Sequence, residues 1–173
     1  MFKTTANKIT MLRIVLIPVF LVLAYSNMMM AALAVYIIAC LSDFADGYIA
    51  RHYNQISNFG KFMDPLADKM LVLAAVCFFV ENGQMAGWAV AIVLFREFAV
   101  SGMRLLAVEQ GQVIAAAWSG KIKTAATMVC LILMMLVNNN VLNIVSTVII
   151  VATTVYSGIE YFYVNRAVFK EAD

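Results

Sequence analysis

Residues 29–80 read MMAALAVYIIACLSDFADGYIARHYNQISNFGKFMDPLADKMLVLAAVCFFV, which is two long apolar runs on either side of a polar segment. Each run approaches the roughly 20 residues that an α-helix needs to cross the hydrocarbon core of a bilayer. The polar part and its flanks hold four of the ten acidic residues of the chain. The stretch therefore predicts two membrane helices joined by a polar loop, with carboxylates concentrated beside that loop.

The rest of the chain continues this pattern. Of its 173 residues, 64% are hydrophobic and only 13% are charged, and the mean hydropathy is +0.90. Such a chain is too apolar for an ordinary soluble domain with a solvated surface. We expect an all-α, polytopic integral membrane protein that forms a single domain over residues 1–173. Its six expected transmembrane helices cover residues 11–26, 29–50, 62–80, 86–108, 118–137 and 141–163.

The N-terminal segment MFKTTANKITMLR, residues 1–13, mixes large apolar residues, among them Phe2, Ile9 and Met11, with the basic residues Lys3, Lys8 and Arg13. Basic amphipathic segments of this kind commonly lie in the plane of the membrane interface. The segment therefore predicts a short interfacial helix before the first transmembrane helix.

Lysine and arginine residues fall on one side of the six-helix topology. The connections YSNMMM, ENGQMAG and VNNNV on the other side contain none. The positive-inside rule therefore predicts that both termini and the acidic loop face the cytoplasm. A net charge of +2 that is spread along this rim gives no case for nucleic-acid binding, but it would attract anionic membrane lipids.

Four aspartates flank the polar loop in two helically spaced pairs. Asp43 and Asp46 are three residues apart, and Asp64 and Asp68 are four apart, so each pair shares one face of its helix. A helical hairpin would bring all four carboxylates together near the membrane surface. Their repulsion in a low-dielectric setting is relieved by protonation or by bound cations. Oxygen ligands without His or Cys favour Mg²⁺ or Mn²⁺, with Ca²⁺ also compatible, and bridging aspartates would hold two ions.

The acidic residues, and the small residues Gly47 and Ala50 between them, also have a purely structural explanation. Acids near a helix end are often simply solvated, and Asp64 would be stabilised by the dipole of a helix that begins just before it. Gly47 and Ala50 leave room for a phosphorylated ligand to approach the helix, although small residues also serve helix packing in membranes. Arg51 offers a permanent fork of donors for phosphate.

The spacing D-x2-D-G-x2-A-R-x8-G-x3-D-x3-D resembles the signature of the CDP-alcohol phosphotransferases. Its fixed positions are occupied by Asp43, Asp46, Gly47, Ala50, Arg51, Gly60, Asp64 and Asp68. The resemblance implies a six-helix membrane enzyme, usually a homodimer, that transfers a phosphatidyl or similar group from a CDP-linked lipid to an alcohol and releases CMP. It also implies that the aspartates hold two divalent cations, and that the last of them, Asp68, is the general base. The CDP-lipid would contact Asp46 and the signature residues between the two aspartate pairs.

Basic residues outside the signature suggest a phosphorylated acceptor. Arg96 and Arg104 in FREFAVSGMR, with Lys121 in WSGKIKTA, are expected to form its phosphate pocket. The alternative for Arg96 is a structural ion pair with Glu97 or another acid, because an unpaired arginine deep in an apolar run would be costly.

Two further segments extend the resemblance over most of the chain. REFAVSGMRLLAVEQGQVIAAAWSGKIKT and NKITMLRIVLIPVF resemble the corresponding regions of bacterial phosphatidylglycerophosphate synthases. This implies transfer from CDP-diacylglycerol to glycerol 3-phosphate at the bacterial cytoplasmic membrane. Asn7, Thr10 and Arg13 match the N-terminal pattern of these enzymes, which implies contacts with the nucleotide headgroup.

Two alternatives remain open at this point. The same catalytic core could serve inositol phosphate, serine or another alcohol, since only the acceptor pocket would differ. A divalent-cation transporter would also place carboxylates among helices, but such sites tend to lie near the bilayer midplane on broken helices. The predicted position of these acids beside a cytoplasmic loop favours the transferase.

Overall fold

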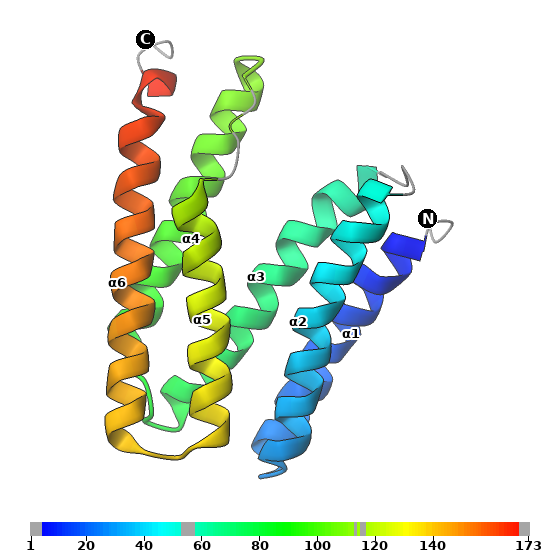
Figure 1. Cartoon of the computed structure of the whole chain (residues 1–173), viewed down its shortest axis with the longest axis vertical. Helices are drawn as coiled ribbons and strands as arrows, with labels where there is room; N and C mark the ends of the chain where they lie inside the picture. Colours follow the sequence, from blue (N-terminus) through cyan, green and yellow to red (C-terminus); the bar gives the residue numbers. More distant parts are fainter. Residues whose placement is uncertain (1–4, 53–57, 113, 115–116, 170–173) are drawn as a thin grey trace.

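The computed structural model describes residues 5–52, 58–112, 114 and 117–169; the side chains of residues 5–8, 43–52, 58–62, 64, 65, 68, 167 and 169 lie outside that description. Within these ranges the chain is entirely helical, without a β-strand (Figure 1). The elements are α1 (Thr5–Tyr25), α2 (Met29–His52), α3 (Asn58–Glu81), α4 (Gly87–Glu109), α5 (Trp118–Leu136), α6 (Asn140–Val164) and the 3₁₀ helix η1 (Arg166–Phe169).

The all-α prediction is confirmed, and each of the six α-helices corresponds to one of the six apolar runs. In the described part of the chain, α5 and α6 are long and apolar enough to cross a membrane. That all six helices are transmembrane remains a prediction.

The prediction of a separate N-terminal helix is wrong for the described residues. Helix α1 begins at Thr5 and continues without a break through Pro18 to Tyr25. Its buried positions recur every three or four residues from Thr10 to Ala24, across the boundary between the basic segment and the apolar run, so one face of a single helix packs against the rest of the protein. These positions are Thr10, Arg13, Ile17, Phe20 and Ala24.

Helix α3 begins four residues earlier than its apolar run suggests, at Asn58 instead of residue 62. The residues before Pro65 contain no helix breaker except Gly60, which a helix tolerates at a modest cost. Gly60 therefore lies inside the helix and Asp64 lies in its second turn, with no acidic residue in the first turn. Stabilisation by the helix dipole, which acts within the first turn, does not explain Asp64.

The helices form two groups that meet side by side. Helix α1 packs along α2 and α3, whereas α6 packs along α5 and α4. Contacts between the groups come mainly from α2 with α5, and α3 touches α4 and α5 over only a few residues. The helices alternate in direction, so the start of α1, the end of α2, the start of α3, the end of α4, the start of α5 and the end of α6 lie toward the same end (Figure 1). Most of the predicted site residues lie in the parts of their helices nearer this end, whereas Arg96 lies near the middle of α4.

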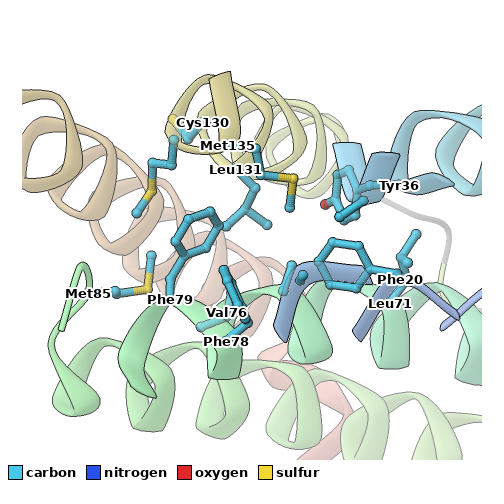
Figure 2. Packing of buried hydrophobic residues seen from close by; sticks show 14 of the residues in the cluster. Phe20, Tyr36, Leu71, Val76, Phe78, Phe79, Met85, Cys130, Leu131 and Met135 are labelled. Carbon is cyan, nitrogen blue, oxygen red and sulfur yellow. The ribbon is translucent and has the colours of Figure 1, made fainter. Parts of the chain in front are cut away.

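A cluster of large apolar side chains fills the space between α1, α2, α3 and α5 (Figure 2). The Phe20 and Tyr36 rings lie with their centroids 5.6 Å apart, and Phe78 meets Phe79 edge to face at 5.6 Å. Leu131 of α5 is fully buried in the same cluster. This core holds the two helix groups together away from the predicted site.

Helix α6 is polar inside and apolar outside, the reverse of a soluble helix. Its buried face carries small polar residues at helical spacing, among them Ser146, Thr154 and Ser157. Its outer face exposes Ile144 and Ile159 by about two thirds of their surface, 65% and 67% respectively. Small polar residues between helices and large apolar residues on the outside are the pattern expected of a lipid-facing helix.

Candidate active site

The signature aspartates all lie on helical backbone. Asp43 and Asp46 belong to the second half of α2, and Asp64 and Asp68 to the first half of α3. The helical spacing predicted for each pair is therefore confirmed, whereas their side chains and the loop at residues 53–57 lie outside the described part. Among the side chains that are described, none form a group of three or more His, Cys, Asp or Glu. The four-carboxylate site remains a prediction.

The other signature positions lie near the same two helix ends. Gly47, Ala50 and Arg51 belong to the last two turns of α2, and Gly60 belongs to the first turn of α3. Their side chains are likewise outside the description. The last turns of α2 and the first turn of α3, to which these residues belong, lie at the same end of the molecule (Figure 1).

The N-terminal residues implied to contact the nucleotide lie in the first turns of α1. Asn7 is in its first turn, with a side chain outside the description. Thr10 and Arg13 are both fully buried, and each has an interaction partner. Full burial is rare for arginine. The buried charge of Arg13 in the N-terminal part of α1 indicates that polar groups surround it in the interior there.

Arg96 takes part in a buried ion cluster with Glu97 and Lys123. The Arg96 Nη1 donates to Glu97 Oε1 at 2.9 Å, and Lys123 Nζ donates to the same oxygen at 2.7 Å. The three side chains are only 12%, 17% and 8% exposed. The ion pair that the sequence offers as an alternative for Arg96 is therefore present within α4, and the second pair, between Lys123 and Glu97, ties α4 to α5.

Two glycines make room for the Arg96 side chain. A Cβ added to Gly120 would lie 3.5 Å from Arg96 Nη2, and one added to Gly158 would lie 3.2 Å from Arg96 Cγ. The arginine thus lies in the interior where α4, α5 and α6 meet. The smallest side chains of α5 and α6 face it there.

The cluster carries an excess of positive charge, because two cations share the single carboxylate of Glu97. In addition, Arg96 Nε is buried without a hydrogen-bond partner among the described residues. An unpaired buried N–H on a charged group is unfavourable. The cluster is therefore electrostatically suited to accept one further anion.

The other two residues predicted to bind acceptor phosphate have different neighbours. Arg104 is exposed, donates from Nε to Tyr161 Oη at 3.0 Å, and places its guanidinium 5.5 Å from the centroid of the Tyr161 ring. Lys121 is exposed, with Nζ 4.6 Å from the centroid of the Trp118 ring. The described structure does not bring Arg96, Arg104 and Lys121 to one point, so their joint pocket remains a prediction.

Lys123 is not among the residues that the sequence predicts for the acceptor pocket, although it lies only two residues from Lys121. Side chains two positions apart on a helix point to nearly opposite sides, so only one of these two lysines can face the interior. Ser119 and Thr127, each four residues from Lys123, are also buried. This spacing is the signal that could have identified Lys123 as the inward lysine.

A second polar chain, also missed, joins α3 to α4. Lys69 Nζ donates a hydrogen bond to Ser101 Oγ, and Ser101 Oγ donates to the backbone carbonyl of Glu97 at 2.7 Å. Lys69 directly follows Asp68 in α3. The helix that carries two signature aspartates is therefore linked through α4 to the ion cluster.

Comparison with known proteins agrees with this geometry. The family model described as CDP-alcohol phosphatidyltransferase matches residues 3–157. A CDP-diacylglycerol--glycerol-3-phosphate 3-phosphatidyltransferase of Bacillus subtilis (strain 168) is 39% identical over 188 residues, covering 96% of this chain and 97% of the relative. A probable phosphatidylglycerophosphate synthase of Mycobacterium tuberculosis (strain ATCC 25618 / H37Rv) is 35% identical, covering 90% of this chain and 78% of the relative.

The family match includes all of the aspartate signature and the first five helices. Enzymes of this family use divalent metal ions, and the membrane character of the family, with the two long apolar helices, indicates a membrane protein. The chain belongs to the CDP-alcohol phosphatidyltransferase family.

Proposed function

We propose that this chain transfers the phosphatidyl group of CDP-diacylglycerol to glycerol 3-phosphate, forming phosphatidylglycerol phosphate and CMP. The observation that carries the proposal is the similarity to the Bacillus subtilis enzyme over nearly the whole of both chains. A relative of Salmonella typhimurium with the same printed name is 37% identical and covers 71% of each chain. These names favour glycerol 3-phosphate over inositol phosphate or serine, and family membership disfavours a cation transporter.

Two divalent cations, Mg²⁺ or Mn²⁺, are proposed to bind Asp43, Asp46, Asp64 and Asp68. A donor set of four carboxylates suits these hard cations, and the helical positions of the aspartates allow each pair to share one side of its helix. When bound, the ions stabilise negative charge on the transferred phosphate and on the leaving CMP.

Asp68 is proposed to accept the proton of the attacking hydroxyl of glycerol 3-phosphate. That oxygen forms a bond to the phosphorus on the lipid side of the pyrophosphate, and the bond from this phosphorus to the bridging oxygen breaks, so that CMP leaves. Arg51 contributes a permanent positive charge beside the pyrophosphate. The CDP-lipid would contact the following residues: Asn7, Thr10, Asp46, Gly47, Ala50, Arg51 and Gly60.

The phosphate of the acceptor is proposed to bind near Arg96, with Arg104 and Lys121 contributing from the exposed rim. Support comes from the excess positive charge that Arg96 and Lys123 leave around Glu97, and from the buried Nε–H of Arg96. A doubly charged phosphate would supply the missing anion in a partly desolvated place, where charge-assisted hydrogen bonds are strongest.

The enzyme is proposed to act as a homodimer in the bacterial cytoplasmic membrane, with both termini and the active site facing the cytoplasm. The placement of Lys and Arg supports this orientation. The arrangement of the helices, with the start of α1 and the end of α6 toward the same end of the molecule as the end of α2 and the start of α3, is compatible with it (Figure 1). Such a site would meet a lipid substrate from the bilayer and a soluble acceptor from the cytoplasm.

An acceptor panel tests the proposal. Purified protein in detergent with CDP-diacylglycerol and Mg²⁺ is offered glycerol 3-phosphate, inositol phosphate, inositol or serine at equal concentration, and CMP release is measured. We expect glycerol 3-phosphate to give the fastest release, and excess chelator to abolish it. If serine or free inositol is the better acceptor, the assignment of the acceptor and of its phosphate pocket is wrong.

A further inference from the structure

We propose that Lys69 and Ser101 are positioning residues that hold α3, the helix of Asp64 and Asp68, in a fixed place relative to α4 and α5. The effect on activity rests on the proposed function, whereas the link between the helices does not. The role of this link is to align the donor phosphate, which the aspartates of α2 and α3 would hold through bound cations, with the acceptor on the other helix group.

The link is continuous across three helices. Lys69 Nζ of α3 donates to Ser101 Oγ of α4, and Ser101 in turn donates to the Glu97 carbonyl one turn earlier in α4 at 2.7 Å. The Glu97 carboxylate accepts from Lys123 of α5 at 2.7 Å. Both Lys69 and Ser101 are partly buried, so water competes only weakly for these hydrogen bonds.

Packing alone gives α3 little support on this side. Helix α3 contacts α1 extensively but meets α4 and α5 over only a few residues. Figure 1 shows α3 diverging from α4 toward the end where Asp64 lies. A hydrogen bond near the middle of α3 is therefore well placed to hold it where direct packing ends.

The position of Lys69 next to Asp68 makes this restraint relevant to chemistry. A carboxylate on a helix lies roughly 6 Å from the helix axis, so a rotation of about 10° moves it by about 1 Å. A displacement of that size in a catalytic group can lower the rate on the order of 10²-fold. A restraint on α3 one residue away from the proposed general base can therefore change the catalytic rate.

The decisive variant is Ser101→Ala, which removes the hydroxyl without adding bulk. Ser101→Thr serves as the conservative variant, because it restores a hydroxyl. Ser119→Ala is the matched control, since Ser119 is a buried serine of α5 whose Oγ has no hydrogen-bond partner among the described residues. The distance between α3 and α4 is measured by spin labels on cysteines that replace the exposed residues Met70 and Leu105, in a background without the native cysteines.

We expect Ser101→Ala to lower kcat about 10-fold, to leave KM for CDP-diacylglycerol within about twofold, and to broaden the α3–α4 distance distribution. Ser101→Thr should recover both properties, and Ser119→Ala should match the wild type. A wild-type distance distribution in Ser101→Ala overturns the proposal whatever its activity, and so does an equal loss of kcat in Ser119→Ala. If the wild-type protein releases no CMP, the proposed function fails, and the distance measurement alone decides this proposal.

Discussion

Replacing Glu97 by glutamine should markedly destabilise the fold. Glu97 is the only described acceptor that Arg96 and Lys123 share, at 2.9 and 2.7 Å. The variant keeps an oxygen of nearly the same shape but removes the negative charge. Two mostly buried cations would then face each other without a counter-ion.

The size of the effect follows from the burial of the cluster. Removing one partner of a buried ion pair costs about 3–5 kcal/mol, and the remaining amide oxygen keeps a hydrogen bond that contributes about 1 kcal/mol. We therefore expect the free energy of unfolding to fall by about 3 kcal/mol. For a chain of 173 residues, each kcal/mol shifts Tm by about 2–4 °C, so Tm should fall by about 6–12 °C.

Thermal unfolding in detergent can be followed with a fluorogenic thiol reagent. Cys130 is buried and reacts only when the core opens, whereas Cys77 is exposed and Cys40 is partly exposed, so both would react in the folded protein. Replacing Cys40 and Cys77 by serine therefore provides the background. The double variant Glu97→Gln with Lys123→Met leaves one cation in excess, as in the wild type. It should therefore regain at least half of the lost Tm.

Two results would refute this reasoning. If Glu97→Gln melts within about 1 °C of its background, the cluster contributes no net stability. If the double variant melts lower still, by the sum of the two single effects, then Glu97 and Lys123 do not act as a pair.

Three further predictions follow from other parts of the structure. Asn139→Ala should lower the free energy of unfolding by about 1 kcal/mol, because Asn139 Oδ1 caps α6 by accepting from the backbone N–H of Val141 at 2.8 Å; an unchanged melting curve would contradict this. Lys121→Ala should reduce kcat/KM for glycerol 3-phosphate by about 10-fold to 150-fold, the loss of one charge-assisted contact of about 1.5–3 kcal/mol, while KM for CDP-diacylglycerol stays unchanged; equal losses for both substrates would exclude a specific acceptor contact. In cells expressing a cysteine-free background, Asn82→Cys should react with an impermeant thiol reagent added outside and Gln112→Cys should not, and the reverse pattern would overturn the proposed orientation.

The helices were predictable because their apolar runs end at polar or glycine-containing turns. The connection at residues 137–139 is an example, since the asparagines cannot stay in the hydrocarbon core and Asn139 instead caps α6. The start of α1 was not predictable in the same way. Its basic residues suggested a separate interfacial segment, but the buried stripe through Thr10 and Arg13 continues that of the apolar run, so the chain remains one helix.

For the site, the sequence predicted contacts between residues that are close along the chain, but it did not predict contacts that depend on how the helices cross. The Arg96–Glu97 pair was foreseeable as an alternative because the two residues are adjacent. The contacts of Lys69 with Ser101 and of Arg104 with Tyr161 join residues 32 and 57 positions apart. Such pairs depend on how α3, α4 and α6 cross, which hydrophobic periodicity alone does not determine.

The central claim is tested most directly by the rate at which purified protein converts labelled glycerol 3-phosphate into chloroform-soluble lipid, compared between the wild type and Asp68→Asn. The wild type should form lipid from CDP-diacylglycerol with one CMP released per label incorporated, and only with Mg²⁺ or Mn²⁺ present. Asp68→Asn should lose on the order of 10²-fold or more in kcat, because the amide cannot accept the proton of the hydroxyl. Near-normal turnover in Asp68→Asn, or full activity in excess chelator, would contradict the account.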